Sequence, residues 1–156
     1  MAERRSRSAP LGQWIAGVGA IVLIASLWTR WYGPDFPLGD FGRPVVEPLV
    51  KSLTLRHTGN AWEVFSGADA ALFALAVGVA VLTAVAVGLV GPRTQAEHRT
   101  IGRLTMLVSI AALAIVVIKL IDQPEPALLI EVSHGAWIGL AGAITMTVGG
   151  WLAAQP

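Results

Sequence analysis

The hydrophobic residues of this chain fall into four long blocks that polar segments separate. The blocks run over Leu11–Trp28, Ala68–Val90, Ile101–Leu120 and Ala136–Ala153. A helix needs about 20 apolar residues to cross a hydrocarbon core of roughly 30 Å, and each block approaches that length. None of the blocks has an ionisable residue near its middle. The pattern therefore predicts an all-α membrane protein, a bundle of four transmembrane helices in a single domain.

The segments between the blocks carry the charge that predicts orientation. They are a tail at 1–10, connections at 29–67, 91–100 and 121–135, and a C-terminal segment at 154–156. Six arginines lie in or beside the tail and the 91–100 connection, close to the ends of predicted helices: Arg4, Arg5, Arg7, Arg93, Arg99 and Arg103. Basic residues near helix ends favour the cytoplasmic side. Both termini are therefore predicted to be cytoplasmic, with 29–67 and 121–135 outside.

Composition supports a membrane protein and narrows its class. The chain is 54% hydrophobic and 13% charged, which lies outside the range of soluble domains. Its net charge of +1 gives no indication of nucleic-acid binding. Most basic residues are arginine and alanine is abundant, which is typical of a GC-rich bacterial genome, so we expect a bacterial plasma membrane. A signal peptide is the alternative for the first block, but this block is long and lacks a small-x-small cleavage pattern.

The connection 29–67 is expected to contain β-structure in its second half. Residues 31–48 are punctuated by prolines and glycines, which favour turns and extended chain. After them Leu53 and Leu55 alternate with polar residues, Gly59–Asn60 has the composition of a two-residue turn, and Trp62 and Val64 share one face of the segment that follows. This pattern predicts a β-hairpin that turns at Gly59–Asn60.

A third strand is expected from the second outer connection. A lone hairpin is only marginally stable in water, so its apolar face needs a cover. Residues 127–133, ALLIEVS, are rich in branched side chains and fit that role. The sequence therefore predicts a small sheet that joins the two outer connections. The alternative is that Pro126 opens a longer fourth helix that includes this segment.

Small residues recur every four positions in three of the predicted helices, a spacing that lets membrane helices approach closely. They are Gly12, Ala16 and Ala20 in the first helix, Ala76, Ala80, Ala84 and Gly88 in the second, and Gly135, Gly139 and Ala143 in the fourth. We expect packing faces in the interior of the bundle, with an oligomer interface as the alternative. Five tryptophans lie near the ends of blocks, which is typical of an interfacial aromatic belt: Trp14, Trp28, Trp31, Trp137 and Trp151.

The segment VIKLIDQPEP raises the question whether Lys119 is a functional charge. A residue before proline is restricted to extended backbone, so the third helix is expected to end near Asp122. Asp122 lies three residues after Lys119 and so on the same helix face. The simpler interpretation is a helix end whose lysine reaches the membrane surface with its long stem. The other is a polar site beneath the sheet, formed by residues expected at one depth: Asp69, Lys119, Asp122, Glu131 and His134.

Several kinds of chemistry find no support in the sequence. Glu131 and His134 have helical i, i+3 spacing, but a metal would need two further ligands, so we predict neither metal nor cofactor. There are no cysteines for disulfides or thiol chemistry. No catalytic triad order, nucleophile elbow or phosphate-binding glycine loop is present, and we expect no enzymatic activity. Asp69 also has a structural interpretation, because with Ser66 it fits a capping box at the start of the second helix.

Four stretches carry a resemblance to known proteins: LWTRWYG, AWEVFSGADAALFAL, KLIDQP and HGAWIGLAG. Together the chain resembles small, uncharacterised four-span membrane proteins of actinobacteria. The resemblance covers most of the chain and implies a fold but no activity, cofactor or site residue. The layout is also similar to that of claudin-type proteins, although their signature cysteine pair is missing and their tryptophan-rich loop motif is not matched.

Two hypotheses about function follow. The first is a structural or accessory membrane protein that binds a membrane or envelope partner, or itself, through its outer β-layer with Trp62 and Phe65 and through its helix faces. The second is a small transporter or channel subunit with the polar cluster at its outer mouth, although such proteins usually place ionisable residues within the spans. A lumen lined by hydroxyl side chains would favour the second hypothesis, and the candidates are Thr83, Thr105, Ser109, Thr145 and Thr147.

Overall fold

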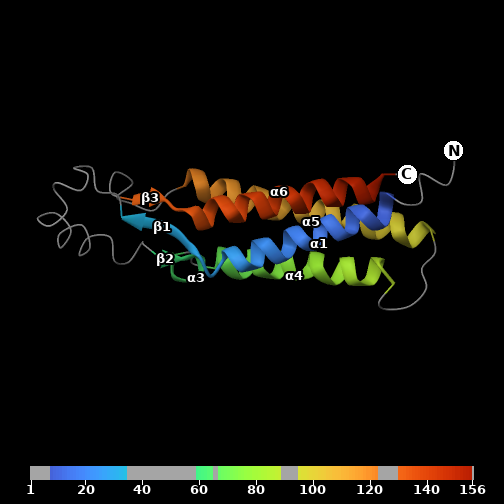
Figure 1. Ribbon diagram of the computed structural model, residues 1–156, viewed down its shortest axis with the longest axis horizontal. Coiled ribbons are helices and arrows are strands. Elements are labelled where there is room, and N and C mark those ends of the chain that lie inside the picture. The colour runs from blue at the N-terminus through green and yellow to red at the C-terminus, as the bar shows by residue number, and fades with distance from the viewer. Residues whose placement is uncertain (1–7, 35–58, 65–66, 89–94, 123–129, 156) are drawn as a thin grey trace, which may run out of the picture.

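The computed structural model describes residues 8–34, 59–64, 67–88, 95–122 and 130–155. Four long helices lie side by side, and short strands with a one-turn helix cover one end, which we call the sheet end (Figure 1). The long helices are α1 (Ser8–Ser26), α4 (Ala68–Ala86), α5 (Gln95–Ile121) and α6 (His134–Ala154). The short elements are β1 (Arg30–Pro34), β2 (Gly59–Asn60), α3 (Ala61–Val64) and β3 (Ile130–Val132). At the opposite end, which we call the terminal end, α1 begins and α6 ends.

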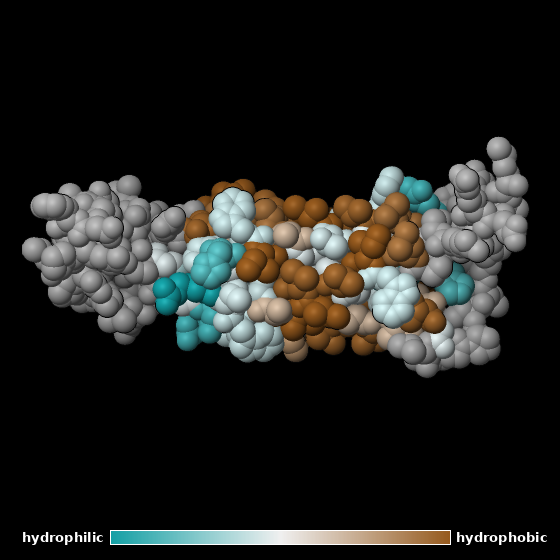
Figure 2. All heavy atoms as spheres, viewed as in Figure 1, coloured by the Kyte–Doolittle hydropathy of each residue, from teal (hydrophilic) through white to brown (hydrophobic). Residues whose placement is uncertain are grey.

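The surface of the bundle is apolar around its middle. Ala68–Ala86, Glu97–Ile121 and His134–Ala154 are each long and apolar enough to cross a membrane, and Leu11–Ser26 is a shorter apolar helix. The visible face carries a hydrophobic band along the helices, with hydrophilic residues towards both ends (Figure 2). A continuous apolar surface of this kind requires a non-aqueous environment. The chain is therefore an integral membrane protein with three or four spans, and its helices contact the lipid bilayer.

α1 and α6 pack against each other in antiparallel directions along a line of mostly small residues. A Cβ added to Gly149 would lie 2.3 Å from the backbone nitrogen of Ala16, and one added to Gly142 would lie 2.8 Å from that of Leu23. We call this contact the α1–α6 seam. Its residues are spaced alternately by three and four positions: Gly12, Ala16, Gly19 and Leu23 in α1, and Gly142, Met146, Gly149 and Ala153 in α6. Only glycine lets the two backbones approach this closely at these points.

The other predicted packing residues lie in different environments. Gly135 and Gly139 are buried at the start of α6. Ala76 is buried in α4, whereas Ala80 and Ala84 are half-buried. Gly88, expected inside the second helix, lies beyond its end with φ +86° and is exposed. A glycine with positive φ just after a helix satisfies its last carbonyls, so Gly88 ends α4 and does not pack within it.

The sheet consists of β1 flanked by β2 and β3, and both neighbours are antiparallel to β1. Tyr32 pairs with Val132 and Pro34 pairs with Ile130. β3 lies within the predicted third strand, and α6 begins directly after it, with Ser133 as its N-cap. The prediction of a sheet that joins the two connections is therefore confirmed, and the alternative of a fourth helix that includes Ile130–Val132 is wrong.

The predicted hairpin at Gly59–Asn60 is wrong. These two residues form strand β2, and the segment after them is the helical turn α3. The cause is a capping box: the Glu63 backbone N–H donates to Asn60 Oδ1, and the Asn60 N–H donates to Glu63 Oε2, each at 3.1 Å. The other predicted strand of the hairpin, around Leu53 and Leu55, lies outside the described residues.

Candidate functional site

β1 carries two large aromatic side chains into the sheet end. Arg30 pairs with Asn60 and Tyr32 pairs with Gly59, so Trp31 is the extra residue of a β-bulge. Successive side chains of a regular strand point to opposite faces, whereas a bulge redirects one of them. Both Trp31 and Tyr32 are fully buried. Trp31 is thus part of the core, and its predicted place in an interfacial belt is wrong.

Trp31 joins β1 to α1 and α6. Its Nε1 donates to the Ser26 carbonyl oxygen at 2.8 Å, and the Thr29 hydroxyl donates to the same oxygen at 2.7 Å. Carbonyls in the last turn of a helix have no partner within the helix, so these bonds satisfy the end of α1. The indole ring lies against α6, where a Cβ at Gly139 would come within 2.6 Å of Trp31 Cζ2. Gly139 therefore makes room for this ring.

Tyr32 joins β1 to α5. Its hydroxyl donates to the carbonyl oxygen of Lys119, in the last turn of that helix. Burial raises the pKa of Tyr32 to about 12, and the negative charge of Asp122 adds to this effect. The hydroxyl therefore remains protonated and able to donate at neutral pH. β1 is tied to three helices by these two aromatic residues.

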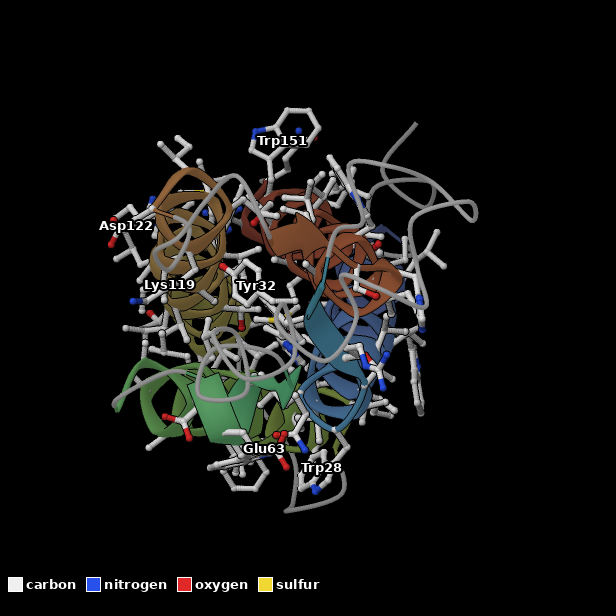
Figure 3. All side chains as sticks on the ribbon, turned by 90° about the vertical axis from the view of Figure 1, so that its left-hand side faces the viewer. Trp28, Tyr32, Glu63, Lys119, Asp122 and Trp151 are labelled. Carbon is white, nitrogen blue, oxygen red and sulfur yellow. The ribbon has the colours of Figure 1, made fainter. Side chains whose placement is uncertain are left out.

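Two members of the predicted polar cluster lie away from the interior of the bundle. Lys119 and Asp122 point away from the bundle on the outer side of α5, whereas Tyr32 points into the space between the helices (Figure 3). His134 is exposed at the start of α6, and its Nδ1 lies 3.3 Å from the Ser133 hydroxyl. The segments that carry all five members lie at the sheet end (Figure 1), where Trp31 and Tyr32 are fully buried.

The remaining members of the predicted polar cluster are Asp69, at the start of a helix, and Glu131, in the sheet. Asp69 is buried in the first turn of α4, whose N-cap is Gly67 with φ 92° and no side-chain cap. Ser66, predicted as the capping residue, lies outside the described residues. The Glu131 backbone pairs with Gly33 in the sheet. Among the described residues no group of three or more histidine, aspartate and glutamate side chains lies close enough to hold a metal ion.

An aromatic patch lies on the sheet end beside α3. It consists of Trp28, Trp62 and Phe73, with ring centroids 5.6–6.1 Å apart and tilted or edge-on geometry. Trp28 and Trp62 are 57% and 37% exposed, so the patch is accessible from outside the bundle. Phe65, the other residue predicted to bind a partner, lies outside the described residues. Sequence reasoning missed Phe73 because its place in this patch depends on the position of α3.

A second polar feature lies inside the bundle near the terminal end. We call it the Gln13 cluster, and it consists of four buried residues of α1, α4 and α5: Gln13, Thr83, Thr105 and Ser109. The Thr83 hydroxyl donates to the Gln13 backbone oxygen at 3.2 Å, and the Thr105 hydroxyl donates to Gln13 Oε1 at 3.5 Å. Ser109 donates to the Thr105 carbonyl at 2.7 Å. Three of the five hydroxyl residues considered for a lumen thus converge.

The other two hydroxyl residues belong to α6, a helix that contributes no residue to the Gln13 cluster. Thr145 and Thr147 each donate to a carbonyl of their own helix, α6, at 2.8 Å. Both residues are half-buried. Neither hydroxyl is bonded to the Gln13 cluster in the described part of the chain, so convergence is shown for three of the five residues. Sequence reasoning missed Gln13 because its side chain is uncharged, and only an ionisable residue stands out within an apolar span.

No protein family model, curated protein or solved structure matches this chain. The resemblance to four-span actinobacterial membrane proteins stays a prediction. The geometry of the sheet end and of the Gln13 cluster is thus the basis for inferring function.

Proposed function

We propose that the chain is a non-enzymatic accessory membrane protein that binds another membrane or envelope protein through the aromatic patch. The observation that carries the proposal is the exposure of Trp28 and Trp62 at one end of a bundle whose sides are apolar. Tryptophan is enriched among the residues that dominate protein–protein binding energies. Trp28 lies in the turn after α1, Trp62 in α3 and Phe73 in α4. The patch therefore forms only when the sheet end is folded.

The sheet end lies outside the cell in this proposal. α1 has 19 residues, about 28 Å of helix, and it follows α6 along the α1–α6 seam, which supports its role as a fourth span. Four spans put both termini on one side. Arg99 and Arg103 are exposed at the terminal end of α5, and basic residues in this position favour the cytoplasm. The aromatic patch then faces partners at the outer membrane surface.

The sheet end holds the aromatic patch in place before any partner binds. A four-residue helix such as α3 is too short to be stable alone. It is fixed by the capping box of Asn60 and Glu63 and by the Ala61 N–H, which donates to the Leu27 carbonyl at 3.2 Å. Side chains that are already ordered lose less entropy on binding. A fixed Trp62 beside Trp28 therefore favours specific recognition over loose apolar adhesion.

Site-specific photo-crosslinking in native membranes tests the proposal. A photoreactive phenylalanine analogue replaces Trp62 in one variant and Trp137 in a control, because Trp137 is 58% exposed on α6 near the sheet end but lies outside the patch. We expect a discrete protein crosslink from position 62 and no such product from position 137. Loss of the partner in Trp62→Ala, with retention in Trp137→Ala, provides a second readout.

Two outcomes contradict the proposal. The first is the same set of crosslinked proteins, in the same yield, from both positions, which would indicate non-specific contact in the membrane. The second is no protein crosslink from position 62 together with a cellular phenotype that is lost in Lys119→Ala and kept in Trp62→Ala. That result would support the polar cluster and a transport function.

A further inference from the structure

The Gln13 side chain is placed where a polar group needs a partner. Gln13 is 3% exposed, and its Nε2 is buried without a hydrogen-bond partner among the described residues. A buried amide N–H that makes no hydrogen bond costs free energy, and within a bilayer bulk water cannot compensate for it. The existing bond to this side chain, from Thr105 Oγ1 to Oε1, is long at 3.5 Å. The amide therefore has unused hydrogen-bonding capacity inside the bundle.

The neighbouring hydroxyl groups can supply hydrogen-bond acceptors. Thr83, Thr105 and Ser109 each use their hydrogen to donate to α1 or α5. A hydroxyl oxygen that donates still has lone pairs with which it can accept. The cluster thus combines a free donor with free acceptors. The oxygen and nitrogen of the Gln13 side-chain amide can be assigned in either of two orientations. In both orientations one of the two atoms lies at the position that has no hydrogen-bond partner.

The close approach of the helices limits the size of that partner. A Cβ at Gly17 would lie 2.9 Å from Thr83 Cγ2, and one at Gly150 would lie 2.8 Å from the Cα of Met106, the neighbour of Thr105. Gln13 is also only five residues from the start of α1, about 8 Å along the helix, so the cluster is near the terminal end. The cluster therefore lies in the half of α1 that is nearer the terminal end.

We propose that the Gln13 cluster binds one internal water molecule. The water accepts a hydrogen bond from Gln13 Nε2 and donates to hydroxyl oxygens of the cluster, and this set of bonds joins α1, α4 and α5. Buried waters in proteins typically make about three such bonds to groups that lack partners. The site is independent of the aromatic patch and of any partner.

Water-edited solid-state NMR of the full chain in lipid vesicles tests the site. The Gln13 side-chain amide signal is assigned by its loss in Gln13→Met, and magnetisation transfer from water is compared with exposed Gln155 and with buried Ala112. We expect transfer to Gln13 at least threefold faster than to Ala112. Thr105→Val, which removes an acceptor, is expected to slow it at least threefold. Thr145→Val, in which the lost hydroxyl bonds only within α6, is the matched control.

Transfer to Gln13 that is no faster than to Ala112 overturns the proposal. Fast transfer that Thr105→Val leaves unchanged also overturns it, because the water would then not be held by the cluster. The remaining amide signals of each variant show that its bundle is folded, which separates loss of the site from loss of the structure.

Discussion

Replacing Gly149 with alanine tests whether the α1–α6 seam holds the bundle together. The new Cβ would lie 2.3 Å from the Ala16 nitrogen and 2.7 Å from the Gly12 oxygen, whereas ordinary contact begins at 3.4 Å. Both neighbours are backbone atoms, so no side-chain rotation relieves the clash. α1 and α6 must therefore separate locally by about 1 Å, the difference between the shorter distance and ordinary contact.

The expected loss follows from that separation. A gap of about 0.5–1 Å forfeits roughly a quarter to a half of the attraction between the atoms that face it. Overpacked sites typically cost about 1–3 kcal/mol, and the better helix propensity of alanine offsets up to about 1 kcal/mol. We expect Gly149→Ala to lower the free energy of unfolding by about 1–2 kcal/mol. Gly142→Ala is expected to cost less, because its Cβ would lie 2.8 Å from the nearest atom.

Gly78→Ala provides the matched control. A Cβ at Gly78, in the middle of α4, meets nothing within 4 Å, so this variant is expected to be as stable as the wild type or up to about 1 kcal/mol more stable. The assay is reversible unfolding in mixed detergent–SDS micelles, followed by far-UV circular dichroism. Equal stability of the Gly149→Ala and Gly78→Ala variants would refute the close packing of α1 against α6.

Three further predictions concern the sheet end and the orientation of the chain in the membrane. Burial raises the pKa of Tyr32 from 10.0 to about 12, so its stabilisation is complete below pH 10 and is lost as the pH rises towards 12. Tyr32→Phe should therefore remove roughly 2 kcal/mol of this alkaline loss, measured as the change between pH 9 and pH 12 in the difference between wild-type and variant unfolding free energies; parallel pH profiles would contradict it. Asn60→Ala should release α3 and increase Trp62 crosslinking to lipid, whereas Asn60→Asp, which keeps the capping oxygen, should not. A cysteine at exposed Asp122 should react with an impermeant thiol reagent from outside intact cells, and labelling only after lysis would reverse the proposed orientation.

The long helices could be predicted from the sequence because a bilayer imposes a strong and local requirement. Each apolar block corresponds to a long helix, and β3 lies in a segment outside the blocks that is rich in branched side chains. These patterns depend on lipid contact and on the composition of one segment, so they need no knowledge of the rest of the fold.

The structure of the sheet end could not be predicted in the same way, for two different reasons. The sequence did contain a signal for the role of Asn60, since Asn-x-x-Glu is a recognisable helix start, but the preceding glycine favoured a turn. The sequence contained no signal for strand β1. Its segment is rich in glycine and proline, and it becomes a strand because β2 and β3, far away in the chain, pair with it. The burial of Trp31 and the convergence on Gln13 depend on the same distant contacts.

The α1–α6 seam has a consequence for biosynthesis. It pairs α1 with α6, so this close approach of two helix backbones joins segments more than 100 residues apart in the chain. At about 5–20 residues per second, a ribosome needs roughly 5–20 s after completing α1 to reach α6. Throughout this interval the α1 residues of the α1–α6 seam lack the helix against which they pack in the folded protein. Membrane insertion of α1 and assembly of the bundle are therefore separate events, and the second cannot finish before α6 has been synthesised.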